Sequence, residues 1–599
     1  MGPESPAGRL AYSVHGRWRY RFVVGFIWFA VFAAAAAGWR YAKSSGPAYG
    51  PVIVISIDSL NADHLSAYGY TKVHTPAIDA LAADAVTFDR AYAHSPLTLP
   101  SHVSMLSGLL PFQAGVRDDI GFPIPGGVSL LPQLLHRRGF KTGGVVSNYL
   151  LRKETGLGAA FGFFDDEFGA VGGEGSPLAT SRDGEASLRI AERWIESIGT
   201  ARFFLFLHLD GPRSPRTVPE RFAKYSAYDA QVAYADEVVG QLVAFLKKRG
   251  LYSGGVIVLT SYHGDSLGDH GEQGHGLFVY ERAIRAALIV KLPRRDGGGR
   301  HSDALVQHID ITPTILDLVG APRPSGLGGR SLRNVLDSPT ATLPNRKVYA
   351  ESLAGRYRFG WSEVQSLTDN RYRFIKSARP ELYDLLQDPK ERVNLVEVET
   401  EAQAQAAAAM RAALDKLTAS SPLPAPAPVA EPERGRLAAM GYVTGLPVAG
   451  PEVPGDQLPD VKDRAAVYDK YWQASGLAAG GNVPGAVAKY QEVVFDDPSM
   501  AVAWDRLTTL LLESGRFKEA GEALTSLLRL YPESVRITEA DQRVQQLLAA
   551  TPTVDHYLLA ARVWTALGEK TRGAEVRAAA RKAHGEAAVR KAERALDRN

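Results

Sequence analysis

Short apolar runs alternate with longer amphipathic segments between Pro51 and about residue 397. Four of these runs are rich in aliphatic or aromatic residues and short enough to be buried strands: 51–58, 202–209, 254–261 and 285–292. The segments between them, such as 228–250, carry apolar residues at helical spacing. This alternation predicts an α/β domain over 51–397, in which a mostly parallel sheet is covered by helices on both faces.

Polar residues stand where several of the predicted strands end. Asp58 follows the first strand, His208 lies at the end of another, and the segment 260–265 ends a third. In sheets of this class, ligands bind at the carboxyl ends of the strands. We therefore expect the functional residues of the domain to gather at this edge.

The segment 22–39 has 18 residues and no charge, and four arginines precede it. About 20 apolar residues span a bilayer, and basic residues mark the cytoplasmic side. The pattern predicts one transmembrane helix over 22–39, a cytoplasmic N-terminus over 1–21 and an exported main domain, on the periplasmic side of the inner membrane in a bacterium. A cleaved signal peptide is the alternative, because the alanine run offers cleavage sites, but the apolar run exceeds the usual length.

The C-terminal part has two sections. Residues 398–462 contain a helical pattern and a Pro/Ala-rich stretch at 420–433, which predicts a semi-rigid linker. Residues 463–599 are helical in pattern, and three kinds of residue recur at a spacing of 34: Gly481 and Gly515, Ala486 and Ala520, Pro498 and Pro532. This period resembles that of tetratricopeptide repeats and predicts an all-α domain that binds a protein partner. An unrelated helical bundle is the alternative.

Composition narrows the function classes. The net charge of +3 results from 68 basic and 65 acidic residues, which gives no reason to expect a nucleic-acid partner. The chain has no cysteine. Disulfides, thiolate metal sites, a cysteine nucleophile and a lipidated N-terminal cysteine are therefore excluded.

The segment 98–108, TLPSHVSMLSG, resembles the sulfatase signature, in which a nucleophile precedes x-Pro-Ser-Arg, a short helix and Thr-Gly. Four further segments resemble sulfatase-like members of the alkaline phosphatase superfamily, in the same order along the chain: 55–70, 75–93, 308–322 and 381–395. The resemblance covers 51–396. It implies a hydrolase or transferase of sulfate or phosphate esters, acting through a covalent intermediate with a divalent metal beside a hydroxyl nucleophile.

The resemblance also implies a metal site at Asp58, Thr98 and His263, which match ligand positions of the family. Ser59 stands where many sulfatases have a second aspartate. The ion is zinc, manganese, calcium or magnesium; one carboxylate suits magnesium and calcium poorly, whereas zinc accepts histidine and mixed oxygen ligands. Asp265, two residues after His263, is expected to face away from the site.

Three catalytic residues follow from the same motif matches. Thr98 occupies the position that sulfatases convert to formylglycine; threonine cannot form this aldehyde, so we expect its hydroxyl to attack directly, as in relatives that transfer phosphoglycerol or phosphoethanolamine. The alternative is that Thr98 only caps a helix. His102 replaces the signature arginine and is expected to donate a hydrogen bond to the anion. His275 lies 12 residues after His263, at a substrate-contacting position.

Two residues depart from the family pattern. Tyr262 stands where relatives have a metal-ligating aspartate, and a neutral phenol with a pKa of about 10 is a poor ligand. Arg213 replaces a histidine that binds the anion or donates a proton. Two hypotheses remain open: a membrane-anchored enzyme acting on an anionic ester, such as an envelope glycan or lipid, or a catalytically degenerate scaffold that binds an anion or a protein.

Overall fold

The computed structural model describes Trp28 and most of the chain from Gly50 onward: 50–168, 181–212, 218–397, 400–430, 452–530, 537–566, 568–596 and single positions between 433 and 442. Gly50–Asn599 forms one compact unit, apart from Met1–Tyr49. Among the helices of these ranges, none has the length and apolarity needed to cross a membrane. Apart from Trp28, the segment 22–39 lies outside the described residues, so the transmembrane helix stays a prediction. Arg213 also lies outside the described residues.

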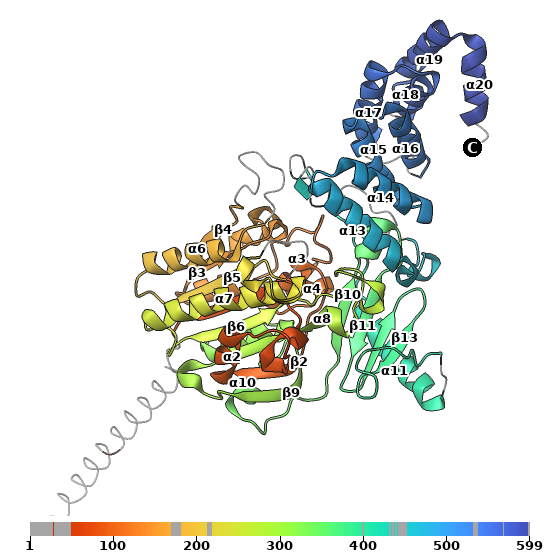
Figure 1. Cartoon of the computed structure of the whole chain (residues 1–599). Helices are drawn as coiled ribbons and strands as arrows, with labels where there is room; N and C mark the ends of the chain where they lie inside the picture. The colour runs from red at the N-terminus through yellow and green to blue at the C-terminus, as the bar shows by residue number, and fades with distance from the viewer. Residues whose placement is uncertain are drawn as a thin grey trace, which may run out of the picture. The chain divides into compact units, whose positions relative to one another are not determined.

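A nine-stranded sheet forms the centre of the α/β domain, in the order β4-β3-β5-β1-β6-β8-β2-β7 with β9 beside β2 (Figure 1). β1 runs parallel to β5 and β6, and β8 runs antiparallel to β6. The predicted fold class is confirmed for this domain, although the run 285–292 forms two short antiparallel strands. The strands are β1 Val52–Ile57, β2 Val86–Tyr92, β3 Lys141–Val145, β4 Phe163–Asp165, β5 Phe203–Leu209, β6 Val256–Ser261, β7 Arg285–Ala286, β8 Leu288–Lys291 and β9 Arg300–Gln307.

Helices cover both faces of this sheet, as its apolar strands require. Ile53, Ile55 and Ile57 of β1 pack in one hydrophobic cluster with α2, α6 and α7. On the opposite face of β1, Ser56 hydrogen-bonds to His102 of α3. The helices of this domain are α2 Pro76–Ala83, α3 Thr98–Ser107, α4 Pro111–Ala114, α5 Leu131–His136, α6 Gly184–Ser197, α7 Ala227–Lys248, α8 Glu281–Ile284, α9 Ile311–Leu318 and α10 Arg333–Asp337.

A second, four-stranded antiparallel sheet follows, made of β10 Val348–Ser352, β11 Val364–Thr368, β12 Tyr372–Lys376 and β13 Glu381–Asp384. The helix α11 Glu401–Thr418 lies against it. Met410 and Leu414 of this helix are buried in one cluster with Phe374 of β12. The helix expected after residue 398 is therefore packed on the smaller sheet.

The Pro/Ala-rich stretch differs from the expected spacer, because its described part lies on the α/β domain. The backbone N–H of Ala427 donates to the carbonyl of Gly121 at 2.7 Å. The hydroxyl of Tyr357 donates to the carbonyl of Pro424 at 2.7 Å. Proline removes backbone donors but leaves carbonyl acceptors, so such a segment can still be held by donors of a neighbouring domain.

The C-terminal section is helical throughout its described residues. Helices α13 and α14, α15 and α16, and α18 and α19 pack as pairs. Gly481 and Gly515, 34 positions apart, both adopt left-handed backbone conformations between paired helices. The tetratricopeptide assignment itself stays a prediction. The helices are α13 Ala465–Ala479, α14 Val483–Asp496, α15 Ala501–Glu513, α16 Phe517–Leu530, α17 Ile537–Ala550, α18 Val554–Ala566, α19 Lys570–His584 and α20 Glu586–Leu596.

One hydrophobic cluster joins the first of these helices to the α/β domain. It contains Tyr468 and Tyr471 of α13 together with Leu277, Phe359 and Trp361. The indole of Trp361 also donates a hydrogen bond to the carboxylate of Asp497 at 3.1 Å. The boundary expected at residue 463 therefore lies within a continuous core.

Candidate metal centre and catalytic site

The carboxylate of Asp58 stands at the end of β1 and is fully buried. The next residue, Ser59, has a positive φ of 51°, which is uncommon for a residue with a side chain. A Cβ atom on Gly211 would lie 2.1 Å from the carbonyl oxygen of Asp58. The turn after β1 is thus tightly constrained, and backbone strain of this kind is often found at functional sites.

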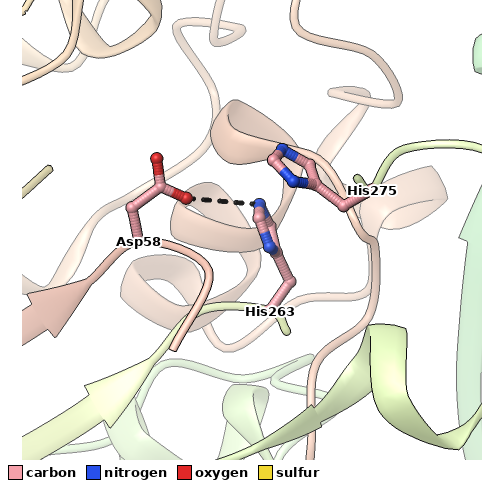
Figure 2. A group of neighbouring side chains, drawn as sticks. All are labelled: Asp58, His263 and His275. Carbon is pink, nitrogen blue, oxygen red and sulfur yellow. Dashed lines mark ion pairs between the residues drawn. The ribbon is translucent and has the colours of Figure 1, made fainter. Parts of the chain in front are cut away.

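Figure 2 shows Asp58 facing the rings of His263 and His275. Ligand atoms of these three residues all lie within 4.8 Å of one another. Nε2 of His263 is 3.8 Å from Oδ1 of Asp58, and the two imidazole centroids are 4.4 Å apart. The structure therefore groups His275, predicted to contact substrate, with two of the three predicted metal ligands.

The donor chemistry of this group fits a zinc ion. Two imidazole nitrogens and one carboxylate oxygen form a set that catalytic zinc sites use, with further positions left for other ligands. Calcium and magnesium prefer more oxygen donors than this set provides. These side chains therefore suit zinc better than calcium or magnesium.

Side chains around the group hold its members in place. The hydroxyl of Ser59 donates to Oδ1 of Asp58 at 2.9 Å and lies 3.3 Å from Nδ1 of His275. Oδ2 of Asp265 lies 3.7 Å from the same nitrogen. Carboxylates and hydroxyls beside a ligating histidine fix its tautomer and orientation. Asp265 therefore faces the site, contrary to the expectation that it points away.

Asp265 is brought inward by a tight turn after His263. Its backbone N–H donates to Oδ1 of Asn61 at 2.7 Å, and Nδ2 of Asn61 donates to the carbonyl of Asp265 at 2.9 Å. A Cβ atom on Gly264 would lie 2.0 Å from the carbonyl oxygen of Arg282. The glycine between the two residues was the sequence signal for this turn, but its direction depends on Asn61, about 200 positions away.

Thr98 is the first residue of α3, is almost fully buried, and does not cap the helix. The N-cap position is Leu97. Oγ1 of Thr98 lies 3.4 Å from the hydroxyl of Tyr262. The capping alternative is therefore not supported, and the hydroxyl faces the site.

The N-terminus of α3 offers an anion fewer free donors than a helix usually does. The N–H of Leu99 donates to Oδ1 of Asp119 at 2.8 Å. Pro100 has no N–H. An anion at Thr98 would therefore depend on the metal and on side chains more than on the N-terminal amides of the helix.

Tyr262 is fully buried and points into the site. Its ring centroid lies 4.1 Å from that of His102, 4.4 Å from that of His263 and 5.5 Å from that of His208. Its hydroxyl extends to Thr98. The phenol thus fills the space between the nucleophile position and the histidines.

His102 makes contacts that differ from its expected role as an anion donor. Nδ1 lies 2.7 Å from the carbonyl of Thr98, and Nε2 lies 2.9 Å from the hydroxyl of Ser56. Burial, with a smaller contribution from His208, holds the pKa of His102 well below its usual value. A neutral ring whose two nitrogens both contact protein atoms supports the start of α3, so these contacts do not favour anion binding, which stays a prediction.

Two family models match the chain. Residues 51–321 match the model described as Sulfatase, and residues 268–420 match that of the N-sulphoglucosamine sulphohydrolase C-terminal region. An N-acetylglucosamine-6-O-sulfatase of Bacteroides thetaiotaomicron is 32% identical over 176 residues, which are 28% of this chain and 31% of the relative. An N-acetylgalactosamine-6-sulfatase of Rattus norvegicus is 24% identical over 329 residues, 46% of this chain and 63% of the relative. The chain thus spans about one to two thirds of these relatives.

Solved structures share the fold at low identity. A phosphonate monoester hydrolase of Agrobacterium radiobacter has a TM-score of 0.53 and 20% identity, covering 62% of this chain and 96% of its own. A protein solved in complex with its substrate D-glucosamine-2-N,6-O-disulfate has a TM-score of 0.53 and 18% identity, covering 62% and 98%. The family matches thus show that residues 51–420 are similar to proteins of the sulfatase family, and the solved structures show that the fold is shared.

Proposed function

We propose that this protein is a zinc-dependent hydrolase or transferase of sulfate or phosphate esters in which the hydroxyl of Thr98 is the nucleophile. The observation that carries the proposal is the grouping of Asp58, His263 and His275 within 4.8 Å at the strand edge where Tyr262 joins the group to Thr98. A zinc ion held there would neutralise the oxygens of a tetrahedral anion and lower the pKa of a bound hydroxyl.

The chain's own residues would divide the remaining work. Thr98 forms a covalent ester with the sulfur or phosphorus while the alcohol of the substrate leaves. The hydroxyl of Tyr262, 3.4 Å from Thr98, would accept the threonine proton as it gives its own proton to the departing alkoxide, so that the alcohol leaves in its neutral form. Burial of Thr98 and Tyr262 excludes bulk water from the nucleophile before substrate binds.

A sulfated or phosphorylated envelope glycan or lipid is the substrate class that we propose. Two relatives are sulfatases of amino sugars, and one fold neighbour hydrolyses phosphonate monoesters. Threonine in place of formylglycine favours direct attack by a hydroxyl.

We also propose that 22–39 anchors the enzyme with its main domain outside the membrane and that α13–α20 bind a protein partner. Protease digestion of a C-terminal epitope in intact spheroplasts supports this topology; protection of the epitope contradicts it.

The competing function is an anion-binding scaffold without turnover. It is favoured by the phenol of Tyr262 at a ligand position and by the occupied N–H of Leu99. Such a protein would bind sulfate or phosphate without cleaving their esters.

The deciding experiment measures zinc content and turnover of para-nitrophenyl sulfate, phosphate and phenylphosphonate by the purified protein, Thr98→Ala and Ser104→Ala. Ser104 is a buried hydroxyl on the same helix, six positions after Thr98, and serves as the control. We expect bound zinc in all three proteins and loss of turnover only in Thr98→Ala. Zinc binding without turnover in the parent, on every ester, would support the scaffold instead.

A further inference from the structure

His275 is carried by the loop between β6 and α8, residues 262–280, and this loop is fastened from within. The carboxylate of Glu272 accepts hydrogen bonds from the N–H of Leu277 and the hydroxyl of Ser266, both at 2.8 Å. Glu272 is fully buried. These bonds fix the course of the loop but do not hold the backbone of His275 itself.

Helix α13 provides the hydrogen bond to that backbone. The hydroxyl of Tyr468 donates to the carbonyl of His275 at 2.9 Å. Oδ1 of Asp469 accepts a hydrogen bond from the N–H of Gln273 at 3.2 Å. Two neighbouring residues of one helix therefore hold two points of the loop that carries a candidate metal ligand.

The approach of Tyr468 depends on a glycine. Gly276 has a φ of +118°, and a Cβ atom there would lie 3.0 Å from the hydroxyl of Tyr468. The hydroxyl of Ser352, from the smaller sheet, donates to the carbonyl of Gly276. The peptide after His275 is thus held between the smaller sheet and α13, and a side chain at 276 would press against the tyrosine.

The helix is itself firmly seated. Tyr468 is only 2% exposed, and its ring centroid lies 5.6 Å from that of Phe359 in the sulfatase-family domain. Tyr471 packs on the same phenylalanine, also at 5.6 Å. Because packed aromatic rings resist displacement, the hydroxyl of Tyr468 has a defined position relative to the loop.

We propose that α13 completes the metal centre, with Tyr468 as a positioning residue that fixes His275 beside Asp58 and His263. The helical C-terminal section is then part of the catalytic apparatus as well as a binding module. This inference rests on the proposed zinc site. The inference adds to the zinc site that a residue outside the sulfatase-family segment, Tyr468, holds one of its ligands in position.

The test uses the full-length protein, Tyr468→Phe and, as a matched control, Tyr471→Phe. Each variant removes one buried hydroxyl from the same helix, and the hydrogen bond to the carbonyl of His275 comes from Tyr468. We expect Tyr468→Phe to weaken zinc binding about tenfold in calorimetric titration, at the lower end of the effect of losing a group that orients a ligand. The visible spectrum of the cobalt-loaded protein should change as well. Tyr471→Phe should match the parent in both measurements.

Hydrogen exchange of the metal-free proteins separates this inference from the proposed function. Amides of residues 264–280 should exchange faster in Tyr468→Phe than in the parent or in Tyr471→Phe. Unchanged exchange in Tyr468→Phe overturns the positioning role, whatever metal the parent binds. If amides exchange faster in Tyr468→Phe but the parent binds no zinc, Tyr468 still holds the loop. The zinc site, and the role of Tyr468 in completing it, are then both overturned.

Discussion

The hydroxyl of Tyr262 lies 3.4 Å from the hydroxyl of Thr98, so the residue that most clearly departs from the family pattern faces the nucleophile. The aspartate that Tyr262 replaces would bring a charge to the metal. A phenol brings instead a hydroxyl that can donate one hydrogen bond and accept another. His275, grouped beside Asp58 and His263, offers an imidazole at a site that has one carboxylate fewer than the family pattern.

Tyr262→Phe tests this interpretation by removing one oxygen and keeping the ring. We expect turnover to fall about 100-fold, at the lower end for loss of a proton-transfer group, while zinc affinity stays unchanged. Steady-state kinetics and calorimetric titration measure the two effects. Full turnover in Tyr262→Phe would remove the phenol from the mechanism, and a loss of zinc would identify it as a ligand.

Tyr262→Asp should strengthen zinc binding by at least tenfold, because it adds a charged oxygen donor beside two imidazoles and a carboxylate. The same change removes a fully buried ring and should cost about 3–5 kcal/mol of stability without metal. Zinc should recover part of this loss, since a ligand that binds only the folded state stabilises it. Thermal melting with and without zinc measures both terms. Equal zinc affinities of parent and variant would place residue 262 out of reach of the ion.

His275→Ala should weaken zinc binding by at least tenfold, since it removes one of three grouped donors. His270→Ala is the matched control on the same loop: its ring stacks on Tyr280 with centroids 3.5 Å apart and belongs to no metal-binding group of the described residues. Calorimetric titration compares the two variants. Similar affinities for both would return His275 to the role of a substrate contact.

The sequence was sufficient for the central strands and for the residues at their ends. Asp58 and His263 follow apolar runs, and parallel strands bring their carboxyl ends to one edge. The sequence could not show that Asp265 turns inward, because its direction is set by hydrogen bonds to Asn61. Nor could the sequence show what holds the loop of His275. Tyr468 donates to a backbone carbonyl, and because every residue has one, the residue types do not indicate which carbonyl is bound.

Glu272, which fastens the loop of His275, should make stability depend on pH. Burial raises the pKa of this carboxyl from 4.5 to about 7, against the opposing effect of its hydrogen bonds from Leu277 and Ser266. The folded protein therefore holds this proton more tightly than the unfolded chain. The stabilisation is fully present below pH 4.5 and is lost as the pH rises through about 7.

Glu272→Gln should remove this dependence, because an amide keeps a carbonyl acceptor for the N–H of Leu277 but does not titrate. Between pH 4.5 and pH 7, the free energy of unfolding of the parent should fall by about 3 kcal/mol relative to that of the variant. This is the free-energy equivalent of the difference between the pKa of Glu272 in the unfolded chain and in the folded protein. Denaturant unfolding of both metal-free proteins on either side of this range measures the difference. Glu522→Gln, at an exposed carboxylate outside the loop, controls for the loss of one charge. Parallel curves for Glu272→Gln and the parent would mean that Glu272 is already ionised in the folded protein, and burial would then not raise its pKa.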